Sequence, residues 1–349
     1  MNVTYPRLRP GCEMIEHNEN KLQIIFANHT VTFTTPIVVT CVKQIVDVLS
    51  GRSAPLITDD QLVTDDQLVA HVTAEADIDP KVVLYVLELM DSSHCLYRSS
   101  EAELTLLDAY YGALGDSPEM SRTRLSTPKL ALFCSARSAD GLEDVLEDAG
   151  IGCTPSLIEA GETIQELEKR VERALALGVS RAALFDFSYR SPTAAFFNRA
   201  ALQAKVSVLF GNCDGLIGRI GPFVLPGSSP CLECLNSRFL SNSTADELLA
   251  FRSYRLRNQH RAGAPAPAHP VFLRAITALF VMELAEIITL KPPQTLGGFI
   301  EYPSSGIVPV RRSFLRVPRC AECAPKKAPR FAWNAVFGSP DVKGARYDA

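Results

Sequence analysis

The chain has 349 residues, of which 47% are hydrophobic and 21% are charged, and its formal net charge is −4. This composition is typical of a soluble globular protein with enough apolar material for a core, and the length favours two domains. The small negative charge gives no reason to expect nucleic acid as the main partner.

Neither a membrane span nor an export signal is predicted. The longest apolar stretch, 271–290, is interrupted by Arg274, Glu283 and Glu286, which favours a buried amphipathic helix. The N-terminus runs directly into Pro- and Arg-rich sequence without the apolar run of a signal peptide. Six of the ten cysteines are scattered within apolar segments, as is typical of reduced core residues. We therefore expect a cytoplasmic protein with no membrane partner.

Residues 1–98 predict a module of three strands followed by three helices. Turn signals separate strands expected at 11–17, 21–27 and 31–35. A first helix is expected from Pro36 to Gly51, a second is expected to end near Ala76, and a third begins at Pro80. This β3α3 order is winged-helix-like.

Such a module can bind DNA or a peptide. The third helix has Lys81 as its only basic residue, opposed by Glu88 and Asp91, whereas a DNA-binding helix needs Arg and Lys for phosphates. A peptide that adds as a strand at the edge 31–35, against the third helix, fits better. The predicted peptide-binding residues are Val31, Thr32, Phe33, Thr34, Leu84, Tyr85 and Glu88.

Residues 99–128 predict one amphipathic helix near 104–111 and then a linker over 115–128. From residue 129 the pattern changes to alternating strands and helices, and strands are expected at 130–134, 153–158, 182–187 and 206–210. Repeated β-α units of this length imply a parallel sheet covered on both faces. This α/β domain is expected to span 129–325, with 326–349 as a C-terminal tail.

Two Cys-x-x-Cys pairs are the most specific feature of the chain. Cys231 and Cys234 form the first pair, and Cys320 and Cys323 form the second. Two such turns supply the four soft ligands of a tetrahedral structural Zn²⁺, with no open position for water. Because 85 residues lie between the pairs, the metal is expected to join two distant segments of one domain. A redox dithiol beside a coincidental second pair is the alternative.

The turn that usually binds nucleotide phosphates in such a domain is missing. A Gly-x-Gly-x-x-Gly turn lets the backbone approach the phosphates closely. The corresponding segment, 134–141, has side chains at those positions and keeps only Gly141. This favours a nucleotide-type scaffold that has lost its nucleotide, although Arg137 and the helix dipole leave nucleotide binding open as an alternative.

These motifs together resemble the ThiF/MoeB superfamily of ubiquitin-activating-like adenylating enzymes. In that superfamily a glycine-spaced strand runs into Pro-Gly-x-x-x-Cys-x-x-Cys, and a later Cys-x-x-Cys completes the zinc site. Here Gly218, Pro222 and Pro226-Gly227 precede Cys231 in the same way. The stretches 6–11, 231–238 and 314–320 are similar to the partner subunit of thiazole/oxazole-modified microcin (TOMM) cyclodehydratases, which carries a recognition element for ribosomally synthesised and modified peptides (RiPPs).

The resemblance implies an N-terminal leader-peptide recognition domain followed by a degenerate Rossmann-like adenylating-enzyme domain. In active relatives an Asp and a nearby Arg act on ATP. Asp186 stands near the place of that Asp, but Ala194 replaces the Arg that usually precedes Asn198. In the microcin branch a separate YcaO-type enzyme uses ATP to convert Cys, Ser or Thr into azolines.

The resemblance therefore implies a non-catalytic subunit in antibiotic or bacteriocin biosynthesis. It would bind the leader of a precursor peptide and present the peptide to the YcaO-type enzyme, with structural Zn²⁺ as its cofactor. An active adenylating enzyme that acts on a peptide or carrier-protein terminus is the alternative. Whether two copies form a homodimer is left open.

Overall fold

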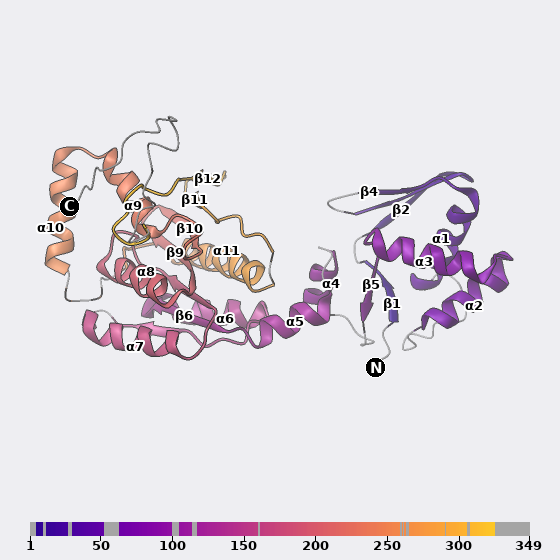
Figure 1. Cartoon of the computed structure of the whole chain (residues 1–349), viewed down its shortest axis with the longest axis horizontal. Helices are drawn as coiled ribbons and strands as arrows, with labels where there is room; N and C mark the ends of the chain where they lie inside the picture. The colour runs from indigo at the N-terminus through magenta and orange to yellow at the C-terminus, as the bar shows by residue number, and fades with distance from the viewer. Residues whose placement is uncertain are drawn as a thin grey trace, which may run out of the picture. The chain divides into compact units, whose positions relative to one another are not determined.

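The computed structural model describes residues 5–9, 12–26, 30–51, 63–99, 105–113, 117–159, 161–258, 260, 262, 265–289, 291–305 and 308–324. The chain forms two compact units, each with its own hydrophobic core (Figure 1). The first unit comprises 1–128, 144–153 and 285–291, and the second comprises the rest of the chain.

The first unit contains the predicted three strands followed by three helices. Its antiparallel sheet has the order β2-β3-β4, with β2 (Glu13–Asn18), β3 (Lys21–Ile25) and β4 (Thr30–Phe33). The helices α1 (Pro36–Leu49), α2 (Asp65–Ala76) and α3 (Pro80–Ser92) pack against one another. Alternate residues of the sheet, among them Leu22, Ile24 and Phe33, are buried in the core that these helices share.

Residues at the helix starts explain where the helices begin. Pro36 and Pro80 occupy the first turns of α1 and α3, where a missing N–H costs nothing. At the start of α2, Thr64 and Gln67 form a reciprocal capping box. These local sequence signals mark the residue at which each helix begins.

Two features of the first unit differ from the sequence prediction. Strand β1 (Tyr5–Leu8) pairs antiparallel with β5 (Leu96–Ser99), and this ribbon was not predicted. The linker prediction is wrong at 118–126, because helix α5 (Pro118–Ser126) lies there, after α4 (Leu106–Ala113). The hydroxyl of Ser117 caps α5, so a Ser-Pro pair that is typical of a turn here starts a helix.

The second unit is built on a mixed sheet of seven strands in the order β12-β11-β10-β9-β8-β6-β7. The strands from β7 to β9 run parallel, and those from β9 to β12 are antiparallel. Their bounds are β6 (Leu130–Ser135), β7 (Ser156–Ile158), β8 (Arg181–Phe185), β9 (Ser207–Asp214), β10 (Ile217–Val224), β11 (Gly298–Pro303) and β12 (Val310–Ser313). The four parallel strands and β10 confirm the predicted β-α pattern and the glycine-spaced strand. The last two strands were not predicted, and the sheet is mixed instead of parallel because β10 runs antiparallel to β9.

Helices pack against both faces of this sheet. The helices that follow its strands along the chain are α6 (Ala139–Asp148), α7 (Ile164–Ala176), α8 (Pro192–Ala204), α9 (Leu232–Ser241), α10 (Ala245–Asn258) and α11 (Pro270–Ile288). Helices α7 and α8 lie side by side (Figure 1), and Phe197 of α8 packs edge-on against Phe133 of β6. Phe133 stands opposite Leu184, so Phe185 points to the other face, where it contacts Phe280 of α11.

Helix α11 fits tightly against the sheet because of one glycine. A Cβ atom at Gly211, which stands opposite Phe185, would lie 2.5 Å from the ring of Phe280. The helix predicted over 271–290 is thus largely buried against the sheet. Among the described residues, no helix combines the length and the apolar character that crossing a bilayer requires.

Candidate metal centre and strand-end polar network

Four cysteine thiols converge at one point of the second unit. Cys231 and Cys234 lie at the N-terminus of α9, and Cys320 and Cys323 lie in turns that follow β12. All four sulfur atoms lie within 4.8 Å of one another, and three of the pairs are 3.4 to 3.9 Å apart. Sulfur atoms around a tetrahedral ion, each at about 2.3 Å from it, are about 3.8 Å apart. The cluster therefore fits a metal ion with four sulfur ligands.

Neighbouring groups hold this cluster in place. The N–H of Val317 donates to Sγ of Cys234 at 3.4 Å, and Oδ1 of Asn198 accepts the N–H of Leu232 at 3.0 Å, which fixes the first turn of α9. A hydrogen bond from the Cys231 thiol lowers the pKa of Cys234 and so favours the thiolate form that binds metals. Four thiolate ligands leave no position for water or substrate, so this arrangement suits a structural metal and not a catalytic one.

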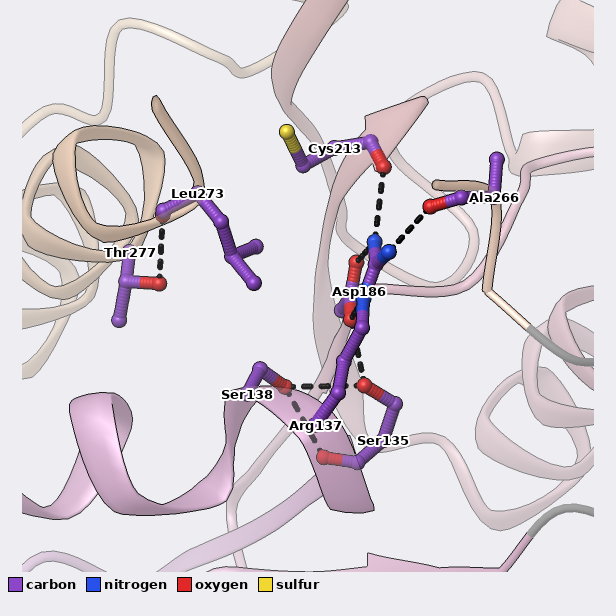
Figure 2. A network of polar contacts seen from close by, with 8 residues as sticks. All are labelled: Ser135, Arg137, Ser138, Asp186, Cys213, Ala266, Leu273 and Thr277. Carbon is purple, nitrogen blue, oxygen red and sulfur yellow. Dashed lines mark hydrogen bonds and ion pairs between the residues drawn. The ribbon is translucent and has the colours of Figure 1, made fainter. Parts of the chain in front are cut away.

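A second polar site lies where strands β6, β8 and β9 end (Figure 2). The fully buried carboxylate of Asp186 accepts hydrogen bonds from Nε of Arg137 at 2.7 Å and from Nη2 at 2.6 Å. The hydroxyl of Ser135 also donates to this carboxylate. Arg137 donates further to the carbonyl of Cys213 at 3.1 Å and to that of Ala266. One guanidinium group thus joins three strand ends and the segment at Ala266.

Two titratable groups in Figure 2, Arg137 and Cys213, are held in forms that do not suit acid–base or nucleophilic catalysis. Hydrogen bonding to Asp186 raises the pKa of Arg137, so its guanidinium stays charged beside the carboxylate. Burial raises the pKa of Cys213 to about 11, so its thiol stays protonated and is a poor nucleophile. Cys134, at the end of β6, has its pKa raised to about 12 by burial. The site is a closed ion pair rather than an open acid–base centre.

The turn between β6 and α6 is filled by its own side chains. The hydroxyls of Ser135 and Ser138 lie 3.1 Å apart, and the Ser138 hydroxyl donates to the carbonyl of Ser135 at 3.0 Å. Residues 136–138 form a 3-10 turn that leads into α6. A glycine-rich turn would leave its backbone N–H groups open to a phosphate, whereas here two serines and Arg137 surround that position.

The predicted peptide-binding residues differ in exposure. On β4, Thr32 is exposed, Val31 is partly buried and Phe33 is buried, so Phe33 can offer a ligand only its backbone. Thr34, just after β4, is also exposed. On α3, Glu88 is exposed, and Leu84 and Tyr85 are 47% and 59% exposed. These seven residues lie on β4, just after it and on α3 of the first unit, whereas the structure brings the four cysteines together directly.

Sequence reasoning did not predict the pairing of Arg137 with Asp186. The two residues are 49 positions apart and meet because β6 and β8 are adjacent parallel strands that end at the same edge of the sheet. The signal in the sequence is a basic residue just after β6 and an acidic residue just after β8, two strands later in the chain. The contribution of Asn198 to the start of α9 was also not predicted.

A scan against protein-family models finds no match, and neither does a search of curated proteins. Solved structures do match. The heterocyclase TruD has a TM-score of 0.68 and 18% identity over 92% of this chain and 43% of its own. A heterocyclase in complex with substrate and cofactor has a TM-score of 0.67 and 19% identity over 92% of this chain and 40% of its own.

MccB from E. coli has a TM-score of 0.59 and 12% identity over 93% of this chain and 98% of its own. This chain therefore spans about two fifths of the length of the two heterocyclases and nearly all of MccB. At such low identities the likeness concerns the fold. The chain shares its mixed α/β fold with MccB and with the matched part of these heterocyclases.

Proposed function

We propose that this protein is the leader-peptide-binding subunit of an azoline-forming cyclodehydratase complex that makes a ribosomal peptide natural product. Two heterocyclases share its fold over 92% of the chain, and one of them was solved with substrate. MccB, a microcin C7 biosynthetic enzyme solved with N-formylated MccA, shares the fold as well. The shared fold supports a role in this class of biosynthesis.

The closed pair of Arg137 and Asp186 is the observation that favours a scaffold over an adenylating enzyme. Nucleotides bind at the carboxyl ends of the parallel strands in sheets of this kind, with their phosphates at a helix N-terminus. Here a guanidinium and two serine side chains occupy that place. Separating a buried ion pair costs about 3–5 kcal/mol, because it leaves an unpaired buried charge. We therefore assign the ATP-dependent step to a separate YcaO-type enzyme.

We assign leader binding to the outer edge of β4. Among the described strands, β4 pairs only with β3, so its other side offers backbone donors and acceptors to an added strand. Leu84, Tyr85 and Glu88 of α3 are exposed in the same unit and are the proposed contacts for leader side chains. The backbone of this edge would provide affinity, and the exposed side chains would provide selectivity.

We further propose that the four-cysteine cluster holds one Zn²⁺ per chain. Four thiolates in a tetrahedral arrangement are the preferred ligand set of structural zinc. The observed sulfur–sulfur distances fit such an ion. The ion would join α9 to the turn after β12, and it has no part in the chemistry of the reaction.

An active adenylating enzyme is the second candidate, and it is favoured by MccB, which was also solved with ATP. The two candidates differ in their affinity for ATP. We expect the purified chain to show no micromolar ATP binding by calorimetry and no ATP–pyrophosphate exchange, because side chains fill the turn at 135–138. MccB, measured alongside, is the positive control. Exchange activity that Asp186→Asn abolishes would establish the adenylating enzyme instead.

Reconstitution tests the proposed function directly. The chain is combined with a YcaO-type enzyme and a short Cys/Ser/Thr-rich precursor peptide encoded beside its gene, and mass spectrometry follows the loss of one water per azoline. We expect ring formation to need both this chain and the leader of the peptide. Deletion of residues 1–97 should abolish it while the metal content of the remaining unit is unchanged. Equal processing by the deletion variant would contradict the proposal.

A further inference from the structure

Strand β12 forms one edge of the seven-stranded sheet (Figure 1), and among the described strands it pairs only with β11. The N–H of Phe314 donates to the carbonyl of Gly297, and hydrogen-bonded pairs alternate along an antiparallel ladder. Residues 310 and 312 therefore turn their backbone groups towards β11, whereas Arg311 and Ser313 turn theirs outward. All four residues of β12 are exposed.

The chain around this edge is strongly basic. Residues 308–319 include four arginines and no acidic residue. Arg312 pairs with Glu301 of β11, but Arg219 pairs with the same carboxylate, so one negative charge faces two positive ones. Arg311 and Arg319 are exposed to solvent. The edge therefore carries a net positive charge.

Exposed apolar side chains flank these arginines. Val308 and Leu315 are 72% and 77% exposed, and Val310 is 43% exposed. Charges alone can protect a sheet edge against unwanted pairing, but apolar side chains beside them gain free energy when a partner covers them. Outward backbone groups, positive charge and apolar side chains together suit an extended peptide.

We propose that β12 binds an extended acidic segment of a partner protein, which adds to the sheet as a further strand. Its backbone would pair with Arg311 and Ser313, and its carboxylates would face the arginines. A second copy of this chain fits less well, because two paired β12 strands would place arginines opposite arginines. This edge lies in the second unit, so the inference does not depend on leader binding at β4.

The test uses a fluorescein-labelled octapeptide, Gly-Glu-Val-Glu-Val-Glu-Val-Gly, titrated with the full chain and followed by anisotropy. We expect saturable binding with a Kd below about 1 mM, and much weaker binding of the matched peptide with lysine in place of glutamate. Ser313→Pro removes an outward N–H without breaking a hydrogen bond to β11, so it should weaken binding about tenfold, whereas Ser313→Ala should not. Arg311→Glu should weaken binding about tenfold, and Arg173→Glu, an equal charge change on the exposed surface of α7, by about twofold at most.

Three results would overturn the inference: no saturable binding of the acidic peptide, full binding by Ser313→Pro, or equal weakening by Arg311→Glu and Arg173→Glu. Sedimentation that shows a dimer abolished by Ser313→Pro would assign the edge to a second copy instead. Melting curves identify any variant that fails to fold. If Ser313→Pro fails to fold, an octapeptide with N-methyl groups at alternate residues removes the same class of hydrogen bond from the peptide side, and unchanged affinity would then count against strand addition.

Discussion

Replacing Cys320 by serine should release the metal and destabilise the second unit by at least about 3 kcal/mol. The free energy of metal binding, about 10–16 kcal/mol for structural zinc, is also folding free energy, because the site does not exist in the unfolded chain. The cluster joins α9 to the turn after β12, and Cys231, Cys234 and Cys320 belong to the core that α7 and α8 share. For a unit of this size, 3 kcal/mol corresponds to a fall of roughly 6–12 °C in melting temperature.

Metal analysis and calorimetry together check this prediction. Wild-type protein should contain one zinc per chain and Cys320→Ser should contain much less, and a strong chelator should lower the wild-type melting temperature towards that of the variant. Cys153→Ser is the matched control, because Cys153 is a partly buried cysteine outside the cluster. An unchanged melting temperature in Cys320→Ser, or well-folded wild-type protein without metal, would rule out a structural role for the site.

Replacing Thr32 by proline should reduce leader binding by about tenfold or more. Proline removes one backbone donor from β4, and each lost hydrogen bond is worth about 1 kcal/mol. The side chain of Thr32 accepts a hydrogen bond from Gln23 on β3, an exposed contact that contributes little to the core. The cysteine cluster belongs to the other unit, so its metal content should not change.

Two control variants separate loss of the edge from general damage. Thr32→Val keeps the backbone of β4 and should bind the leader normally. Glu16→Pro places the matching lesion on β2, the opposite edge of the three-stranded sheet, because Glu16 pairs with Leu22, the neighbour of Gln23 with which Thr32 pairs, and it should also bind. Fluorescence anisotropy with a labelled leader peptide measures all three variants. Normal binding by Thr32→Pro, or equal loss in Glu16→Pro, would contradict β4 as the binding edge.

The sequence predicted the parts of the fold that follow from local periodicity. Alternation along 21–25 and the apolar stripe of α1 are visible without knowledge of their neighbours, and the structure confirms both. The ribbon of β1 and β5 could not be predicted, because two strands of four residues each owe their pairing to the module between them. Strand β12 was missed because all of its residues are exposed, so it shows no alternation.

The two candidate sites also differ in whether the sequence alone predicts them. The cysteine cluster could be predicted because each Cys-x-x-Cys turn already presents two thiols to one point, and four soft ligands favour a shared ion. The pair of Arg137 and Asp186 depends on the order of the strands in the sheet, which the sequence does not state. The sequence shows only that the turn lacks the glycines of a phosphate-binding loop, and it does not show that Arg137 and two serines fill this turn.

The order of synthesis matters for a metal site whose halves are 89 residues apart. At about 5–20 residues per second, the ribosome delivers Cys320 roughly 4–18 s after Cys231. During this interval α9 carries two thiols without their partners, and β11 is made only towards its end. Under the proposed structural role of zinc, metal capture is therefore among the last events in the biogenesis of the second unit, and zinc shortage would leave chains in which the first unit is complete and the second is not.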